Sequence, residues 1–252
     1  MNTLVWLAAI LFLLMILVGG KKGARSFIAL FLNFGVLLIT ILIMTIPNVN
    51  PIILTLIACT LISSISLFYI NEVNITTKTA FISTMITIVI LLLFIVIVTK
   101  KAMFQGFSEE QTEEISVFSL YIGVDFVKVG ASVIIMSTIG AITEVAISVA
   151  SLMREVCNHN PLISRKDLFT SGLRVGRDIL GTDTNTLFFA FFGSYLGLLI
   201  WFKDLSYSVG EIANSKVFTA EMINILCAGI GLALIIPITA GITAYSLVKT
   251  KE

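Results

Sequence analysis

A single carboxylate, Glu144, lies inside a long apolar stretch of the sequence. In lipid such a group is costly, and it usually faces a protein interior or a wet cavity. On a helix of about 3.6 residues per turn, several small and polar residues fall on the same face as Glu144. These residues are Gly130, Ser137, Gly140, Ala141, Ser148 and Ser151. Two interpretations follow. Either Glu144 is a proton or cation site at the cytoplasmic mouth of a pathway, or a neighbouring Arg, Ser or backbone group holds the carboxylate and locks helix packing.

A second polar group precedes another apolar stretch. It reads Gly-Arg-Asp-Ile-Leu-Gly-Thr-Asp-Thr-Asn-Thr over residues 176–186. Hydroxyl, amide and carboxylate groups at a helix N-terminus can cap the helix or bind an ion there. Arg177 and Asp178 can pair with each other or with Glu144, because both segments are expected at the inner interface. The predicted inner polar site consists of Glu144, Arg177, Asp178, Thr182, Asp183, Thr184, Asn185 and Thr186.

The remaining reactive residue types give no sign of catalysis. His159 is the only histidine, and one histidine without partner spacing makes no metal site. No glycine loop follows a strand to bind phosphate, and no nucleophile elbow is present. We therefore expect neither an enzyme nor a metal or cofactor, and no nucleic-acid partner. An odd number of cysteines, two of them in apolar runs, predicts buried small side chains rather than disulfides at Cys59, Cys157 and Cys227.

Transmembrane helices must position these residues. Of the 252 residues, 58% are hydrophobic and 12% are charged, whereas soluble domains carry about 25% charged residues. A helix needs about 20 apolar residues to cross a hydrocarbon core of about 30 Å, and its backbone must satisfy its own hydrogen bonds there. We predict an all-α, polytopic membrane helix bundle that forms one domain over residues 1–252. The seven expected spans are 3–20, 26–46, 51–70, 79–98, 126–150, 184–202 and 222–248.

The distribution of Lys and Arg predicts the orientation, because these residues stay on the cytoplasmic side. With the amino terminus outside, the inner segments hold 11 of them and the outer segments hold 4. Lys128 lies at the edge of the fifth span, three residues after Asp125, with which it can pair. The opposite orientation inverts the bias. We therefore expect the amino terminus outside and the carboxyl terminus in the cytoplasm.

Two short helices are expected beside the spans. Pro161 ends the cytoplasmic extension of the fifth span, and Ser164 followed by Asp167 fits a capping box. The helix that follows, over about 164–180, mixes basic and apolar residues and is predicted to lie along the inner membrane surface. A short outer helix with four acids is predicted to start at Ser108.

Small residues predict where the helices pack closely. The last span repeats small residues and one proline every four positions, and the sixth span carries two glycines that can face them. Close packing is one interpretation of this ridge, and gating at the proline kink is the other. The residues predicted to pack are Gly140, Ser148, Ser151, Gly193, Gly197, Gly229, Ala233, Pro237 and Gly241.

Several motifs between residues 146 and 186 occur in a distinctive combination. They are Ser-Val-Ala-Ser from Ser148, an Asn-Pro break at 160–161, Ser-Arg-Lys-Asp-Leu-Phe from Ser164, and above all the run over 176–186. Together they resemble the YibE/F family of bacterial multi-pass membrane proteins. The resemblance implies a bacterial cytoplasmic membrane and a permease, and relatives that occur as paralogous pairs imply a hetero-oligomer.

One residue departs from the family pattern. Asp183 stands where an apolar residue such as Met is usual, which makes the inner site of this member more acidic. We predict a permease, or a permease subunit, that moves a small solute or ion through an inner polar site between the fifth and sixth spans. The alternative is a non-transporting membrane scaffold or regulatory subunit of a hetero-oligomer. The expected partners are the lipid bilayer and either a paralogous membrane subunit or further copies of the same chain.

Overall fold

The computed structural model of the protein describes residues 3–46, 48–102, 126–204 and 206–249. Every regular element in these ranges is a helix, which confirms the all-α prediction. The elements are α1 Thr3–Met44, α2 Pro51–Ser64, the π-helix η1 Ile65–Tyr69, α3 Ile75–Ala102, α5 Phe126–His159, α6 Arg165–Ser194, α7 Leu196–Asp204, α8 Val209–Asn214 and α9 Lys216–Lys249. The outer helix predicted from Ser108 and the predicted pair partner Asp125 lie outside the described residues.

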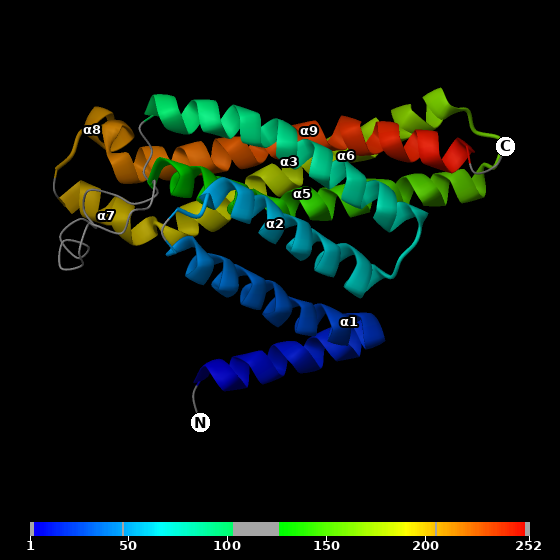
Figure 1. Ribbon diagram of the computed structural model, residues 1–252, viewed down its shortest axis with the longest axis horizontal. Coiled ribbons are helices and arrows are strands. Elements are labelled where there is room, and N and C mark those ends of the chain that lie inside the picture. The colour runs from blue at the N-terminus through cyan, green and yellow to red at the C-terminus, as the bar shows by residue number, and fades with distance from the viewer. Residues whose placement is uncertain (1–2, 47, 103–125, 205, 250–252) are drawn as a thin grey trace.

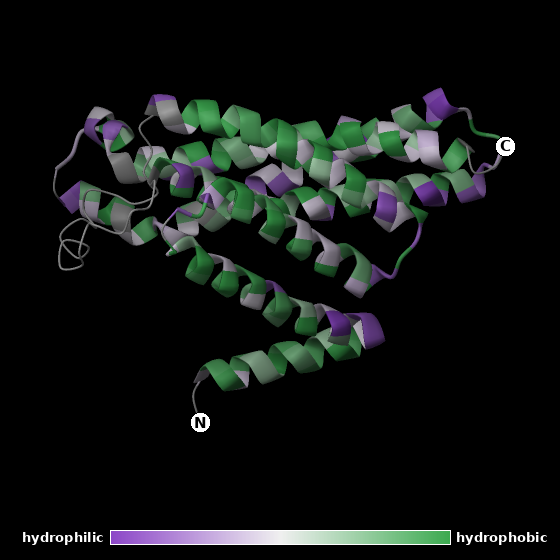
Figure 2. Cartoon of the chain, in the orientation of Figure 1, coloured by the Kyte–Doolittle hydropathy of each residue, from purple (hydrophilic) through white to green (hydrophobic). Residues whose placement is uncertain are grey.

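Among the residues that the structure describes, five helical segments are long and apolar enough to cross a membrane. They are Thr3–Met44, Pro51–Tyr69, Ile75–Thr99, Val127–His159 and Phe218–Val248. Figure 2 shows hydrophobic residues along most of the length of these helices and many of the hydrophilic residues at helix ends and connections. Four of the predicted spans are therefore single apolar helices, two are joined in α1, and the predicted span 184–202 has no counterpart among the five.

Helix α1 is a hairpin of two arms. Gly20 has φ 56° and ψ −136°, a left-handed conformation that glycine adopts without steric cost. The chain reverses at this point, as Figure 1 shows. A Cβ atom at Gly23 would overlap the carbonyl group of Met15, so the arms approach closely beside the bend. The two arms correspond to the predicted spans 3–20 and 26–46.

Helices α2 and η1 form one continuous helical segment. The side chain of Asn50 accepts a hydrogen bond from the Ile52 N–H at 3.1 Å and caps the start of α2. Pro51 occupies the first turn, where a missing N–H costs nothing. The segment continues through the π-helix to Tyr69 and matches the predicted span 51–70.

Helix α5 is the centre of the bundle (Figure 1). It packs against α2, α3, α6 and α9. Ile142, Val145, Ala146 and Val149 on this helix are wholly buried or nearly so. The core therefore lies mainly between α3, α5 and α9. The three cysteines are buried, as predicted.

Hydroxyl groups lie within this apolar core and bond mostly to their own helices. Ser83 and Thr87 on α3 each donate to the carbonyl group four residues earlier. Two hydroxyl pairs cross between helices, one joining Thr79 to Thr243 at 3.3 Å and the other Ser63 to Thr143 at 3.4 Å. Such bonds satisfy polar groups that lipid and apolar side chains cannot.

Helix α6 runs unbroken and antiparallel to α9. Its contacts along α9 come in opposite sequence order, because Gly176 lies against Ile236 and Thr184 lies beside Gly229. Toward the far end of α6, Tyr195 donates a hydrogen bond to the Glu221 carboxylate near the start of α9. This helix therefore follows an apolar span over nearly its whole length.

The prediction of a separate surface helix over about 164–180 is wrong. The helix cap at Ser164 is confirmed, because its hydroxyl accepts from the Asp167 N–H and donates to the Asp167 carboxylate. The helix it opens, however, continues to Ser194 and turns Gly172 toward Ala240 of α9. Gly172 and Gly176, spaced four apart, give α6 a flat face that packs on α9. Arg174 and Arg177 are exposed on the other side of the helix.

Candidate functional site

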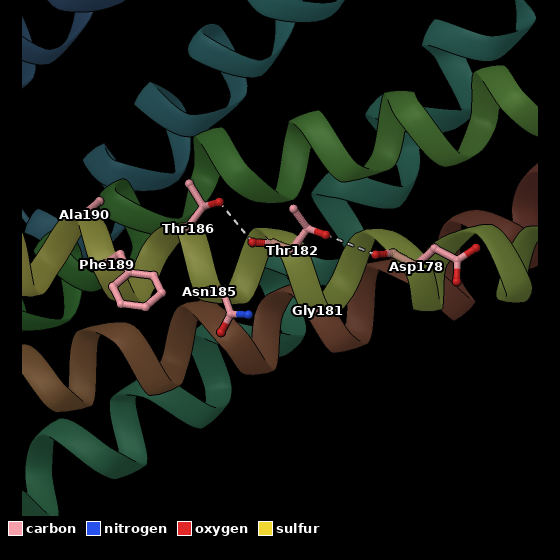
Figure 3. A pocket seen from close by; sticks show the side chains of 7 residues that line it. All are labelled: Asp178, Gly181, Thr182, Asn185, Thr186, Phe189 and Ala190. Carbon is pink, nitrogen blue, oxygen red and sulfur yellow. Dashed lines mark hydrogen bonds between the residues drawn. The ribbon is translucent and has the colours of Figure 1, made fainter.

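An open hollow lies along the middle of α6 (Figure 3). Its volume is about 750 Å³. The lining residues are Asp178, Gly181, Thr182, Asn185, Thr186, Phe189 and Ala190. Four predicted site residues, namely Asp178, Thr182, Asn185 and Thr186, therefore share one surface.

The polar groups of this hollow are only partly satisfied. Thr182 donates to the carbonyl oxygen of Asp178 at 3.4 Å, and Thr186 donates to that of Thr182 at 3.0 Å. The Asp178 carboxylate and the Asn185 amide extend from the helix (Figure 3) and form no hydrogen bond or ion pair with any residue that the structure describes. The surface thus offers carboxylate, amide and hydroxyl oxygens, which suit a hard cation or a hydrated polar solute.

The hollow lies at mid-depth along the bundle. The α9 residues beside this part of α6 are Gly229 and Ile236, and both belong to the apolar span Phe218–Val248. At about 1.5 Å per residue, each is about 16 Å or more from either end of that span. Figure 2 likewise shows hydrophilic residues on α6 in the middle of the bundle. The lining residues therefore lie beside the middle of an apolar helix. Their place at the inner membrane interface stays a prediction.

Glu144 on α5 lies at a comparable depth. It stands 16 residues after Lys128 and 10 before Arg154, or about 24 Å and 15 Å along the helix. Helix α5 continues to His159, beyond the end of the predicted span at residue 150. The position of Glu144 near the cytoplasmic mouth stays a prediction. Its side chain is exposed and has no partner among the described residues.

The exposure of Glu144 belongs to a whole face of α5. Ser137, Gly140 and Ser151 are exposed on the same side, whereas the neighbours Thr143 and Val145 are buried. The interpretation of Glu144 as a packing lock needs a partner within the chain, and the described residues supply none. The exposed face leaves the carboxylate available to an ion, to water or to another protein chain.

The other predicted site residues are placed differently. Arg177 is exposed on α6, and the predicted pairs with Asp178 or Glu144 are absent from the described contacts. Asp183 and Thr184 are half-buried, and Thr184 lies against α9 near Gly229. The structure therefore brings four of the predicted site residues together in the hollow on α6, whereas Thr184 lies at the interface between α6 and α9.

The predicted packing residues are also divided. Open space surrounds Gly140, Gly193 and Gly197, so the prediction that they pack closely is wrong within the single chain. Gly229 and Gly241 lie beside α6, whereas Ala233 and Pro237 are exposed, as is Ser151, and Ser148 is half-buried. The residues that contact α6 are larger, chiefly Ile236 and Ala240, because the glycines at this contact come from α6 itself.

Some contacts were not indicated by any sequence pattern. Ser137 donates a hydrogen bond to the side chain of Asn224 on α9. The guanidinium of Arg165 lies 5.2 Å from the ring centre of Tyr245. Each joins α9 to a distant helix, and spacing within one segment cannot reveal such pairs. Within the described ranges, no group of three or more His, Cys, Asp or Glu side chains could hold a metal ion.

Helices long and apolar enough to cross a bilayer, with an open polar surface beside one of them, indicate an α-helical integral membrane protein. A family model described as YibE/F-like protein matches residues 7–249, nearly the whole chain. The chain belongs to the YibE/F-like family, as its motifs predict. Comparison with curated proteins and with solved structures found no match.

Proposed function

We propose that this protein is a permease, or the membrane subunit of a permease, for a small hydrophilic solute or ion. The observation that carries the proposal is the open polar hollow on α6 beside the apolar span of α9. Polar groups at membrane depth are costly unless they serve a pathway or meet other protein. Secondary transporters often bind substrate near the bilayer midplane, and in this proposal Asp178 and Glu144 lie near that plane.

The proposed topology has seven crossings in a bacterial cytoplasmic membrane. The two arms of α1 supply two crossings, and α6 with α7 supplies a polar crossing that composition alone does not reveal. The beginning of α1 and the end of α9 lie at opposite ends of the bundle (Figure 1), which fits an odd number. The Lys and Arg bias supports the amino terminus outside.

In this proposal Asp178, Asn185 and the two threonine hydroxyls hold the solute, and Glu144 carries a proton or a cation. A carboxylate without a partner at mid-depth responds strongly to a bound cation, because the low dielectric there strengthens electrostatic interactions. The hydroxyl groups keep lone pairs free after bonding to their own helix. Reorganisation of the site on ion binding is therefore small.

The test is transport by purified protein in proteoliposomes on a solid-supported membrane. The probes are gradients of Na⁺, K⁺, Mg²⁺, phosphate and sulfate, with pyranine inside the vesicles to record proton movement. We expect a signal with at least one ion, its loss in Glu144→Gln and in Asp178→Asn, and its retention in Val133→Ala. Val133 is a matched control, because it is also exposed on α5 but apolar.

Equal signals from Glu144→Gln and the unsubstituted protein would remove Glu144 from the proposal. A complete lack of signal for every probe, together with lower membrane abundance of Glu144→Gln, would favour the alternative of a scaffold or regulatory subunit. The exposed glycines on α5 and α6 support this alternative, because small residues allow close contact with another membrane helix.

A further inference from the structure

The exposed sides of the neighbouring helices α5 and α6, together called the α5–α6 face, are left uncovered by the rest of the described chain. Glu144 on α5 and Asp178 and Asn185 on α6 are exposed. A Cβ atom at Gly140 or Gly181 would meet no atom within 4 Å, so both helices present backbone directly to the outside. The opposite faces of the same helices are packed against α3 and α9.

The charges on this face balance one another. Arg174 and Arg177 are exposed on α6 one turn apart, near the exposed acid Asp178 and at a depth close to that of Glu144. Two cations and two carboxylates cannot face acyl chains without a large cost, and within the described chain they form no ion pairs with one another. Opposite charges on one surface can pair with those of a second copy when a symmetry axis brings each charge beside its opposite.

Membrane geometry decides how such a copy would fit. Two copies with the same orientation in a bilayer can be related by a two-fold axis along the membrane normal, so residues at equal depth meet. Arg177 and Asp178 are adjacent in the sequence and therefore about 1.5 Å apart in depth. The two-fold axis brings the base of each copy beside the acid of the other.

We propose that a second copy of this chain packs on the α5–α6 face and closes the site, with Arg177 of each copy paired to Asp178 of the other. The inference rests on the proposed function for the membrane depth of the site and adds the partner that completes it. Gly181 and Gly140 let the helices approach closely, as small residues do in membrane helix contacts. The hollow becomes a chamber between the copies instead of a surface open to lipid.

Disulfide crosslinking in native membranes tests the contact. Gly181→Cys places a thiol one turn from Asp178, and Asn185→Cys is a second reporter if the first disturbs the helix. The control is Val89→Cys, exposed on α3 away from this face. The natural cysteines are buried, so the unsubstituted chain gives the background. We expect about tenfold more dimer from either α6 reporter than from Val89→Cys, because a fixed contact raises the effective thiol concentration.

Charge reversal then tests the pairing. Arg177→Asp and Asp178→Arg, each combined with Gly181→Cys, are expected to lower crosslinking about tenfold when expressed alone, because like charges meet across the axis. Expressed together with tags of different size, they are expected to restore a mixed dimer, because an acidic face then meets a basic face. The mixed dimer also shows that both variants insert and fold.

No dimer at either α6 reporter, equal dimer at Val89→Cys, or a crosslink to a different polypeptide would overturn the inference. Crosslinking without restoration of the mixed dimer would overturn the Arg177–Asp178 pairing that defines it. The two proposals can fail separately. If the dimers crosslink but the protein moves no probe, the contact between copies stands and the transport function is contradicted. If the vesicles transport a probe but the protein does not crosslink, the transport function stands and the contact between copies is contradicted.

Discussion

The two faces of α6 differ in what their residues contact. The face against α9 carries Leu168, Gly172 and Gly176, which are buried and define how close the helices come. The other face carries Arg177, Asp178 and polar residues that bond to nothing outside their own helix among the described residues. The face against α9 stabilises the fold through close helix packing. The polar face takes no part in that packing.

The largest expected difference between the faces comes from two glycines five residues apart. Gly176→Leu is expected to destabilise the protein by about 3 kcal/mol, because any side chain there overlaps Ile236 and overpacking is costly. Gly181→Leu is expected to stabilise the detergent-solubilised monomer by up to about 1 kcal/mol, because leucine favours helix more than glycine and the space is open. Thermal unfolding in detergent measures both, and equal losses of stability would abolish the distinction between the faces.

A smaller contrast separates neighbouring residues on α5. Thr143→Val is expected to cost about 0.5–1 kcal/mol of stability while transport continues, because it removes the hydroxyl contact to Ser63 across the α2 interface. Glu144→Gln is expected to leave stability unchanged and to stop transport, because Glu144 has no partner in the described fold. Chemical denaturation and vesicle transport on both variants separate the roles, and a large destabilisation by Glu144→Gln would contradict an exposed carboxylate.

The smallest effect is expected outside both faces, at the start of α8. Hydrogen bonds from the Ser208 N–H and hydroxyl lower the pKa of the Glu211 carboxyl below its ordinary value. The charged form is therefore favoured in the folded state, and its contribution is present above the ordinary pKa and lost as the pH falls through the lowered one. Ser208→Ala is expected to raise that pKa while leaving transport unchanged, as carboxyl chemical shifts in NMR titration would measure. An unchanged pKa would contradict the hydroxyl contribution.

Much of the fold follows from apolar length. The spans 51–70, 79–98, 126–150 and 222–248 each match an apolar helix, because the bilayer requirement acts on a single segment and needs no knowledge of neighbours. The cap at Ser164 is equally local. Gly20 marks the bend of α1 because a positive φ is a property of one residue.

The sequence predictions that were wrong share a physical cause. Each depends on which helices pack against one another, and the sequence of one segment does not determine that. The charges of residues 164–180 suggest a surface helix until Gly172 and Gly176 are seen to pack on α9. Gly140 and Gly193 were predicted to pack closely, but α5 and α6 pack against the other helices through different faces.

Thiol accessibility in intact membranes tests the central claim most directly, namely that α6 holds a wet polar surface at mid-depth. Asn185→Cys and Val89→Cys are treated with a membrane-impermeant maleimide in right-side-out and inside-out vesicles, and labelling is measured by mass. Asn185→Cys is expected to be labelled from at least one side, because it lines the hollow, whereas Val89→Cys, exposed on α3, is expected to be shielded by lipid. Protection of Asn185→Cys from both sides, equal to that of Val89→Cys, would contradict the account.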